Sequence, residues 1–142
     1  MSVQLAVFLE NRPGKLEAIT KALAEAGVNI RGISMASEGE FGVLKILAGD
    51  PEKAFRVLKE HHYTVSRRTV EIALIDDRPG GLHDLLAALS ARDINIEDCY
   101  GIALEEGRRA AIVLDVERFP EAEAVLKQRG VRLLGDRELG TI

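Results

Sequence analysis

The stretch Asn11-Arg12-Pro13-Gly14-Lys15-Leu16 occurs a second time, slightly altered, as Asp77-Arg78-Pro79-Gly80-Gly81-Leu82. Between residues 12 and 30, eight residues are identical at this single offset of 66 positions, without gaps. A further match at an offset of 68 joins residues 57–59 to residues 125–127, so the second copy has gained two residues in between. Two copies of this length nearly account for the 142 residues of the chain. Such self-similarity predicts a repeated structural unit. The identical pairs are Arg12 and Arg78, Pro13 and Pro79, Gly14 and Gly80, Leu16 and Leu82, Ala22 and Ala88, Leu23 and Leu89, Asn29 and Asn95, and Ile30 and Ile96.

Each copy has the pattern of a strand, a helix, two strands, a helix and a strand. Apolar residues at helical spacing begin at Leu16 and at Leu82, and Asp50 followed by Pro51 is typical of a second helix start. A hairpin turn is expected at Glu106-Gly107. The sequence therefore predicts an α+β protein made of two ferredoxin-like βαββαβ domains with antiparallel sheets, at residues 1–67 and 68–142. The expected strands are residues 3–9, 28–37, 41–48, 63–65, 70–75, 94–104, 110–116 and 131–134.

The first strand is apolar on both of its faces. Apolar residues occupy positions 3, 5, 7 and 9 on one face, and Ala6 and Phe8 stand on the other. A sheet with one wet face should alternate apolar and polar residues. We therefore expect the second face to be covered by the sister copy or by another chain. The alternative is a strand that simply exposes a few apolar side chains.

Charge and terminal sequence exclude several classes of protein. Lys and Arg number 19 and Asp and Glu number 23, which gives a formal net charge of −4. This balance lacks the basic footprint of a nucleic-acid-binding protein. The amino terminus has no basic leader, and no run approaches the roughly 20 apolar residues of a membrane span. We therefore expect a cytoplasmic protein that binds neither nucleic acid nor membrane.

Residues that carry catalysis or bind metals are few. The counterpart of the single cysteine, Cys99, is Ile33, so we expect Cys99 to pack in a core. The histidines are His61, His62 and His83, and no two of them have the i, i+4 spacing of a helical metal site. No glycine-rich nucleotide loop and no nucleophile motif occurs. We expect no catalytic residue, no metal and no cofactor.

The two turns, each placed after a strand and before a helix, resemble those of the ACT domain. The first helix closes in residues 26–30, Ala-Gly-Val-Asn-Ile, and the second in Asp93-Ile94-Asn95-Ile96. The resemblance covers nearly the whole chain, and both halves carry it in register. It implies a stand-alone pair of ACT domains. ACT domains are regulatory modules that bind small ligands, typically amino acids.

In the ACT family the ligand usually sits where two units meet, between the loop after the first strand of one unit and the second strand of its neighbour. The resemblance therefore implies contacts from both turns and from the starts of both second strands. Unpaired N–H groups at a helix start attract a carboxylate, and a glycine lets a ligand approach the backbone. The candidate ligand-binding residues are Asn11, Arg12, Pro13, Gly14, Leu16, Asn29, Ile30, Asp77, Pro79, Gly80, Leu82, Asn95 and Ile96.

The polar residue before each turn differs between the copies. Asn11 can donate and accept hydrogen bonds, so it could hold both ends of an amino acid, whereas an ionised Asp77 only accepts. We therefore predict two non-equivalent sites, of which the first matches the family pattern better. The alternative interpretation is structural. Arg-Pro-Gly after a strand is a good turn without any ligand, and Asn29 and Asn95 suit turns that follow a helix.

These observations favour a regulatory protein that binds a small ligand, with an amino acid as the expected one, and catalyses nothing itself. We expect a homodimer that acts on a partner enzyme of amino-acid metabolism. Two alternatives stay open. One is a dimerising adaptor that keeps the shape without sensing a ligand. The other is a small hydrolase of ferredoxin-like fold, for which Arg12 or Arg78 would be the candidate phosphate-binding arginine.

Overall fold

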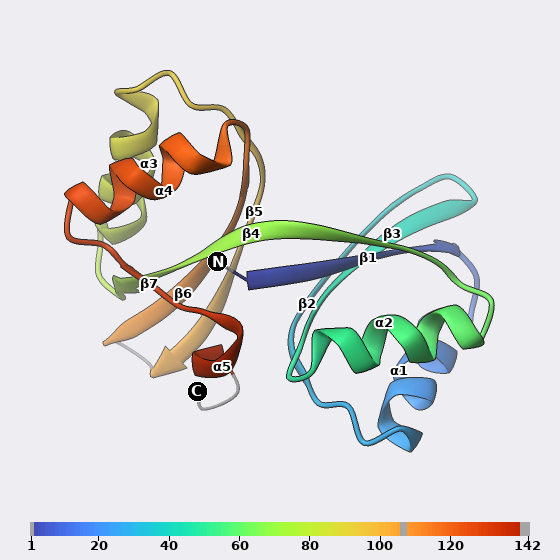
Figure 1. Ribbon diagram of the computed structural model, residues 1–142. Helices are drawn as coiled ribbons and strands as arrows, with labels where there is room; N and C mark the ends of the chain where they lie inside the picture. Colours follow the sequence, from blue (N-terminus) through green and yellow to red (C-terminus); the bar gives the residue numbers. More distant parts are fainter. Residues whose placement is uncertain (1, 106–107, 140–142) are drawn as a thin grey trace. The chain divides into compact units, whose positions relative to one another are not determined.

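The chain folds into two compact units in the computed structural model, which describes residues 2–105 and 108–139 (Figure 1). The first unit is Val3–Arg68, and the second is made of Met1–Ser2 and Thr69–Ile142. The turn expected at Glu106-Gly107 lies outside the described residues. The elements are, in order, β1 (Ser2–Glu10), α1 (Lys15–Glu25), β2 (Ile30–Glu38), β3 (Phe41–Ala48), α2 (Pro51–Glu60), β4 (Thr64–Asp76), α3 (Gly81–Ser90), β5 (Ile96–Glu105), β6 (Arg109–Val116), α4 (Phe119–Gln128), β7 (Arg132–Leu133) and α5 (Asp136–Leu139).

Both units have the βαββαβ order of elements, which confirms the predicted α+β class. The strand order is β2-β3-β1-β4 in the first unit and β5-β6-β4-β7 in the second. The pairs β1–β3 and β2–β3 in the first unit, and β4–β6, β4–β7 and β5–β6 in the second, are antiparallel. The loops after β1 and after β4 therefore occupy equivalent places in the two units.

The expectation of two separate strands at residues 63–65 and 70–75 is wrong, because β4 runs unbroken from Thr64 to Asp76. The intervening residues 66–69 are polar and exposed, and they include no Gly or Pro that would end a strand. Polar residues are compatible with a strand that has one wet face, so these four residues join the two predicted strands into one. The boundary between the units falls within this strand, after Arg68.

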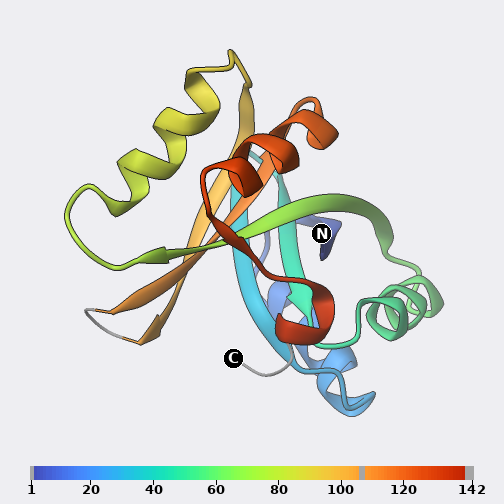
Figure 2. The same ribbon diagram turned by 60° about the vertical axis from the view of Figure 1, so that its left-hand side comes forward.

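Helices cover one face of each sheet. In the first unit, Leu23 of α1 and Leu58 of α2 are fully buried in one apolar cluster with the strands. Their counterparts at the repeat offsets, Leu89 of α3 and Leu126 of α4, are fully buried in the same way in the second unit. Figures 1 and 2 show α3 and α4 side by side. Because burying one such side chain contributes about 1.5–3 kcal/mol, these paired leucines fasten the helices to each sheet.

The opposite face of the first sheet carries exposed apolar side chains. The strand register places Phe8 opposite Val43 and Glu10 opposite Phe41. The rings of Phe8 and Phe41 stack with centroids 5.2 Å apart, yet the two residues are 49% and 47% exposed. The first strand is thus covered on its helix-facing side, whereas Phe8 on its second face is half exposed.

One ionisable residue interrupts the second core. Glu71 in β4 has no exposed surface, and its counterpart in the first unit is the fully buried Leu5. The side chain that interacts with Glu71 from α4 is Glu123, whose counterpart is Phe55. Glu123 accepts a hydrogen bond of 2.8 Å from Lys127 Nζ. Two carboxyl groups in the second unit therefore replace an apolar pair in the first.

Burial raises the pKa of Glu71 to about 7, and the neighbouring carboxyl of Glu123 adds to the rise. The hydrogen bond from Lys127 lowers the pKa of Glu123, so the proton of the pair resides on Glu71. Because the folded pKa of Glu71 lies above its ordinary value of 4.5, the folded protein keeps a proton that the unfolded chain releases. Stability is therefore complete below pH 4.5 and declines as the pH rises to about 7.

Replacing Glu71 by Gln should remove this pH dependence. Gln has the same shape but cannot ionise, so the variant loses no stability when the wild type deprotonates. Between pH 4.5 and pH 7, the wild type should lose about 3 kcal/mol of unfolding free energy relative to the variant. Urea unfolding across this pH range measures the difference. Glu25→Gln, an exposed change on α1, is the control, and identical pH profiles for wild type and Glu71→Gln would refute the assignment.

Candidate functional site

The two predicted turns have the same backbone geometry. Gly14 and Gly80 stand immediately before α1 and α3 with φ angles of +84° and +87°. A residue with a Cβ is strained in this left-handed region, at a cost of roughly 1–2 kcal/mol. The repeated sequence therefore specifies a repeated turn. Its matching hydrogen bonds are Arg12 N–H to the Glu10 carbonyl and Arg78 N–H to the Asp76 carbonyl, both 3.0 Å long.

The first N–H of each helix is bonded within its turn, Lys15 N–H to the Arg12 carbonyl at 3.2 Å and Gly81 N–H to the Arg78 carbonyl at 3.0 Å, which leaves the N–H groups that follow for an anion. Neither α1 nor α3 has a side-chain cap at its first residue. The first N–H groups of a helix have no partner within the helix and carry partial positive charge. Among the described residues, no atom beyond the chain neighbours would lie within 4 Å of a Cβ placed on Gly14. The first turn thus leaves room for a small ligand beside its backbone donors.

Asn11 is exposed and bonded within its own unit. Its backbone N–H donates to the Glu40 carbonyl at 2.7 Å, and its Nδ2 donates to the Gly39 carbonyl at 3.0 Å. In the second unit the same backbone bond runs from Asp77 to the Arg108 carbonyl at 2.9 Å. These bonds fasten each turn to the following hairpin. The Asn11 side chain therefore has a structural role that requires no ligand.

The start of β2 lies at the other end of the sheet from the first turn. Glu10, the last residue before the turn, pairs with Phe41, whereas Ile30 pairs with Ala48. Seven residues of β3 separate these two levels, which at roughly 3.3 Å per residue is about 23 Å. A single unit therefore cannot bring its turn and the start of its own second strand to one small ligand.

Asn29 and Asn95 have equivalent backbone roles. The Asn29 carbonyl accepts a hydrogen bond of 2.8 Å from Gly49, and the Asn95 carbonyl accepts one of 3.1 Å from Glu117. Both residues are exposed. These bonds join the start of each second strand to the end of the third, and neither asparagine has the positive φ of a left-handed turn residue.

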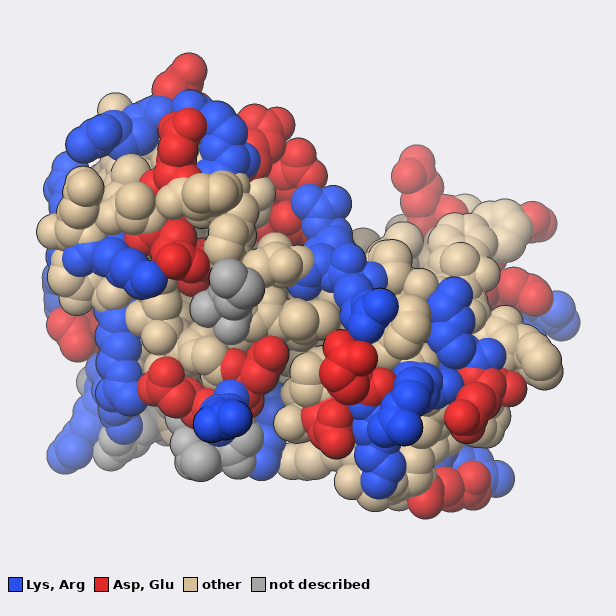
Figure 3. All heavy atoms as spheres, in the orientation of Figure 1, with Lys and Arg blue, Asp and Glu red and all other residues tan. Residues whose placement is uncertain are grey.

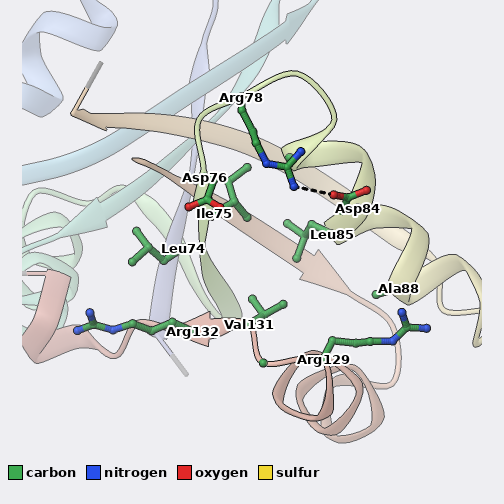
Figure 4. A pocket seen from close by; sticks show the side chains of 12 residues that line it. Leu74, Ile75, Asp76, Arg78, Asp84, Leu85, Ala88, Arg129, Val131 and Arg132 are labelled. Carbon is green, nitrogen blue, oxygen red and sulfur yellow. Dashed lines mark hydrogen bonds and ion pairs between the residues drawn. The ribbon is translucent and has the colours of Figure 1, made fainter. Parts of the chain in front are cut away.

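A groove of about 440 Å³ lies beside the second turn (Figure 4). This volume falls in the usual range of small-molecule sites. Figure 4 shows Ile75, Leu85 and Val131 pointing toward the space between β4, α3 and the segment before β7. The floor of the groove is therefore apolar. Its lining residues are Leu74, Ile75, Asp76, Arg78, Gly81, Asp84, Leu85, Ala88, Arg129, Gly130, Val131 and Arg132.

Charged side chains surround this groove. Arg78 Nη2 lies 3.0 Å from Asp84 Oδ2, and this ion pair joins the turn to α3 (Figure 4). Arg132 pairs with Glu138 at 2.8 Å, and its guanidinium points away from the groove in Figure 4. The Arg78 and Asp84 side chains are 54% and 63% exposed. Exposed pairs of this kind contribute about 1 kcal/mol or less, so the Arg78–Asp84 contact is easily exchanged.

A second groove lies at the start of β5, the edge strand of the second unit. Asn95 and Ile96 line it together with Leu86 and Ser90 of α3. Its volume is about 410 Å³. The predicted residues of this strand start therefore border a cavity, whereas the turn before α3 borders the first groove.

Along the second turn, the residues that line the first groove are not the residues that the sequence predicted. Asp76, Arg78 and Gly81 line the groove, although the prediction named their neighbours instead. Residues 129–132, which also line it, carry no motif. The topology is the signal that could have indicated them, because the fourth strand of a βαββαβ unit pairs antiparallel with the first and begins beside the same turn.

The expectation that Cys99 packs in a core is wrong, because Cys99 is exposed. Its counterpart Ile33 is also 46% exposed. Both residues lie on the edge strand of their sheet, β5 and β2. An edge strand has a neighbour on one side only, so an apolar position there need not be buried.

Other functional features are sparse in residues 2–105 and 108–139. In this part of the chain no group of three or more His, Cys, Asp or Glu side chains could hold a metal ion. None of the helices found there is long and apolar enough to cross a membrane. On the face drawn in Figure 3, Lys and Arg side chains are interspersed with Asp and Glu side chains.

Comparison with known proteins adds a family to this geometry. The sequence profile of the family described as "ACT domain pair" matches residues 1–142. The crystal structure of protein BT0572 from Bacteroides thetaiotaomicron is 32% identical with a TM-score of 0.93, and the match covers 99% of this chain and 96% of that one. The ligand-free regulatory subunit of aspartate kinase from Thermus thermophilus is 17% identical, with a TM-score of 0.67 and 88% of each chain covered. No curated protein matches the chain.

Replacing Gly81 by Ala should destabilise the second unit. A Cβ at Gly81 would collide with the Asp76 carbonyl oxygen, so the turn must shift at a cost of about 1–3 kcal/mol. Helix propensity alone gives the opposite sign, because Ala is favoured over Gly by about 1 kcal/mol. Thermal or urea unfolding shows whether the collision or the helix propensity of Ala decides the stability of the variant. Lys15→Ala at the equivalent place in the first unit should be nearly neutral, and a Gly81→Ala protein as stable as the wild type would contradict this geometry.

Proposed function

Because the chain belongs to the ACT domain pair family, we propose that it is a regulatory protein that binds an amino acid and catalyses no reaction itself. Residues 1–67 and 68–142 would be its two ACT domains. A ligand regulates such a protein by binding one of its conformations more tightly than another, which shifts their populations. The expected recipient of this shift is a partner enzyme of amino-acid metabolism.

The observation that carries the proposal is the repeated left-handed glycine before an uncapped helix. Gly14 and Gly80 have nearly the same φ, and no side chain occupies the cap position of either helix. Backbone N–H groups at such a place suit a carboxylate. The candidate contacts are the predicted residues of the two turns, with Asn11 and Asp77 making the sites non-equivalent.

The starts of β2 and β5 would contribute to a site only across a contact with another ACT domain. The distance of about 23 Å between the two ends of one sheet excludes a joint contact within one unit. We therefore assign Asn29, Ile30, Asn95 and Ile96 to ligand contacts that a second copy of the chain completes. The groove beside Asn95 and Ile96 supports this assignment for the second unit.

A homodimer is part of the proposal. The strand β2 is the edge of the first unit's sheet, and Ile33 and Met35 on it are 46% and 39% exposed. An edge strand presents unpaired backbone groups that pair readily with another strand. A second copy joined at β2 would cover these side chains.

One observation favours the adaptor alternative. The side-chain amide of Asn11 donates to the Gly39 carbonyl at 3.0 Å, so this residue is explained without a ligand. In an adaptor the turns would serve only to place the helices. The regulatory subunit of aspartate kinase, whose fold this chain shares, indicates that the fold can serve regulation as well.

A thermal scan against the twenty amino acids at millimolar concentration tests the sensing function. A ligand at 100 times its Kd should add about 2.7 kcal/mol of stability. Asn11→Ala should erase the shift without unfolding the protein, because Asn11 is exposed in a turn. Asp77→Ala, at the equivalent place, should leave most of the shift if the first turn is the better site. No shift with any amino acid would favour the adaptor.

Light scattering after size exclusion tests the homodimer. The chain has a mass of 15.5 kDa, and we expect the wild type to elute with twice this mass. Ile33→Lys should reduce the mass to that of one chain, because a charge on the edge strand disfavours strand pairing. His83→Lys, an exposed change on α3, is the control. A wild type that stays at the mass of one chain at high micromolar concentration would end the dimer proposal.

A further inference from the structure

The groove beside the second turn is built from a single unit. All of its lining residues lie between positions 74 and 132 of the second unit. It therefore needs neither another domain nor a second chain for its walls. It borders the second turn, to which ligand contacts are assigned above, so the inference about it rests on the proposed function and deepens it for the second unit.

Two small residues keep this groove open. Gly81 stands where the first unit has Lys15, and Val131 stands where the first unit has Tyr63. In the first unit Tyr63 is partly buried against the apolar core. The second unit therefore has a smaller side chain, Val131, at the position where the first unit has the large ring of Tyr63.

The chemistry of the groove is mixed in a particular way. Ile75, Leu85 and Val131 point into it and are branched and aliphatic (Figure 4). At its rim Arg78 donates from Nη2 to Asp84 and from Nη1 to the Pro79 carbonyl. An aliphatic floor with a guanidinium at the mouth matches a molecule with a short apolar chain and one acidic end.

We propose that this groove binds a small aliphatic carboxylate, whose chain lies on Ile75, Leu85 and Val131 and whose carboxylate displaces Asp84 from Arg78. Arg binds carboxylates with two parallel hydrogen bonds, a geometry that an ammonium group cannot use. In the free protein Asp84 holds the Arg78 guanidinium in place, and the carboxylate of the ligand then replaces the carboxylate of Asp84.

This exchange gives a prediction of unusual sign. If Asp84 competes with the ligand, removing its charge should strengthen binding instead of weakening it. Asp84→Asn should tighten the complex about threefold, the scale of one exposed ion pair. Arg78→Gln should weaken it by about tenfold or more, since a charge-assisted hydrogen bond is lost. If the ion pair were only structural, Asp84→Asn and Arg78→Gln would not change the affinity in opposite directions.

The test is a titration of the whole protein with isocaproate, followed by amide chemical shifts in NMR, with isoamylamine as the cationic probe of the same shape. We expect isocaproate to shift the signals of Ile75, Leu85 and Val131, and isoamylamine to leave them unchanged. Val131→Tyr, which restores the side chain of the first unit, should abolish the shifts. Arg56→Gln, which removes an exposed arginine from α2 of the first unit, should leave the isocaproate affinity unchanged.

Several results would overturn the proposal. They are the absence of isocaproate shifts at millimolar concentration, equal binding of isoamylamine, or an affinity that Arg78→Gln does not reduce. An unchanged affinity in Asp84→Asn would refute the exchange. Because Arg78 and Asp84 are exposed, these variants should fold even if Val131→Tyr does not. Asn11→Ala should not affect isocaproate binding, so failure here and failure of amino-acid sensing are separate outcomes.

Discussion

The constraint on which each unit depends is a backbone reversal completed in four residues. The chain leaves β1 at Glu10 and must begin α1 at Lys15, and it does the same between Asp76 and Gly81. A glycine in the left-handed region makes this reversal without strain. A residue with a Cβ would be strained at the same place. Once the turn is set, the helix lies back over its own strand, and the paired leucines of the core fix it there. The same turn leaves the helix start without a side-chain cap, which is the feature on which the proposed ligand contacts depend.

Duplication has preserved this backbone and changed the chemistry placed on it. The fully buried Leu5 of the first unit is replaced by Glu71 in the second, and Phe55 is replaced by Glu123. The large Tyr63 is replaced by Val131, which opens a groove. Each exchange costs the second unit some apolar packing. The two units are therefore alike in fold, and they differ in the polarity and size of the side chains at these three positions.

The sequence predicted the βαββαβ order because apolar spacing and glycine turns are local signals, and the repeat at offset 66 supplied each signal twice. It failed where the outcome depends on neighbours in space. The predicted strands stop at Val65 and resume at Val70, although residues 66–69 continue the same strand. Cys99 was expected in a core because its counterpart is Ile33. Of the site, the turns could be predicted from Arg-Pro-Gly. The groove could not, because Val131 becomes significant only when the fourth strand is placed beside Ile75.

The edge strand β2 has a consequence for the free chain. Its central residues 32–37, Gly-Ile-Ser-Met-Ala-Ser, carry no charge and no proline. Natural edge strands are commonly blunted by lysine, proline or a covering segment, and an unblunted one is a template for aggregation. Arg31 and Glu38 are the charged residues at the two ends of this segment. This uncharged edge is therefore a place where an unwanted strand from another chain could pair with the backbone.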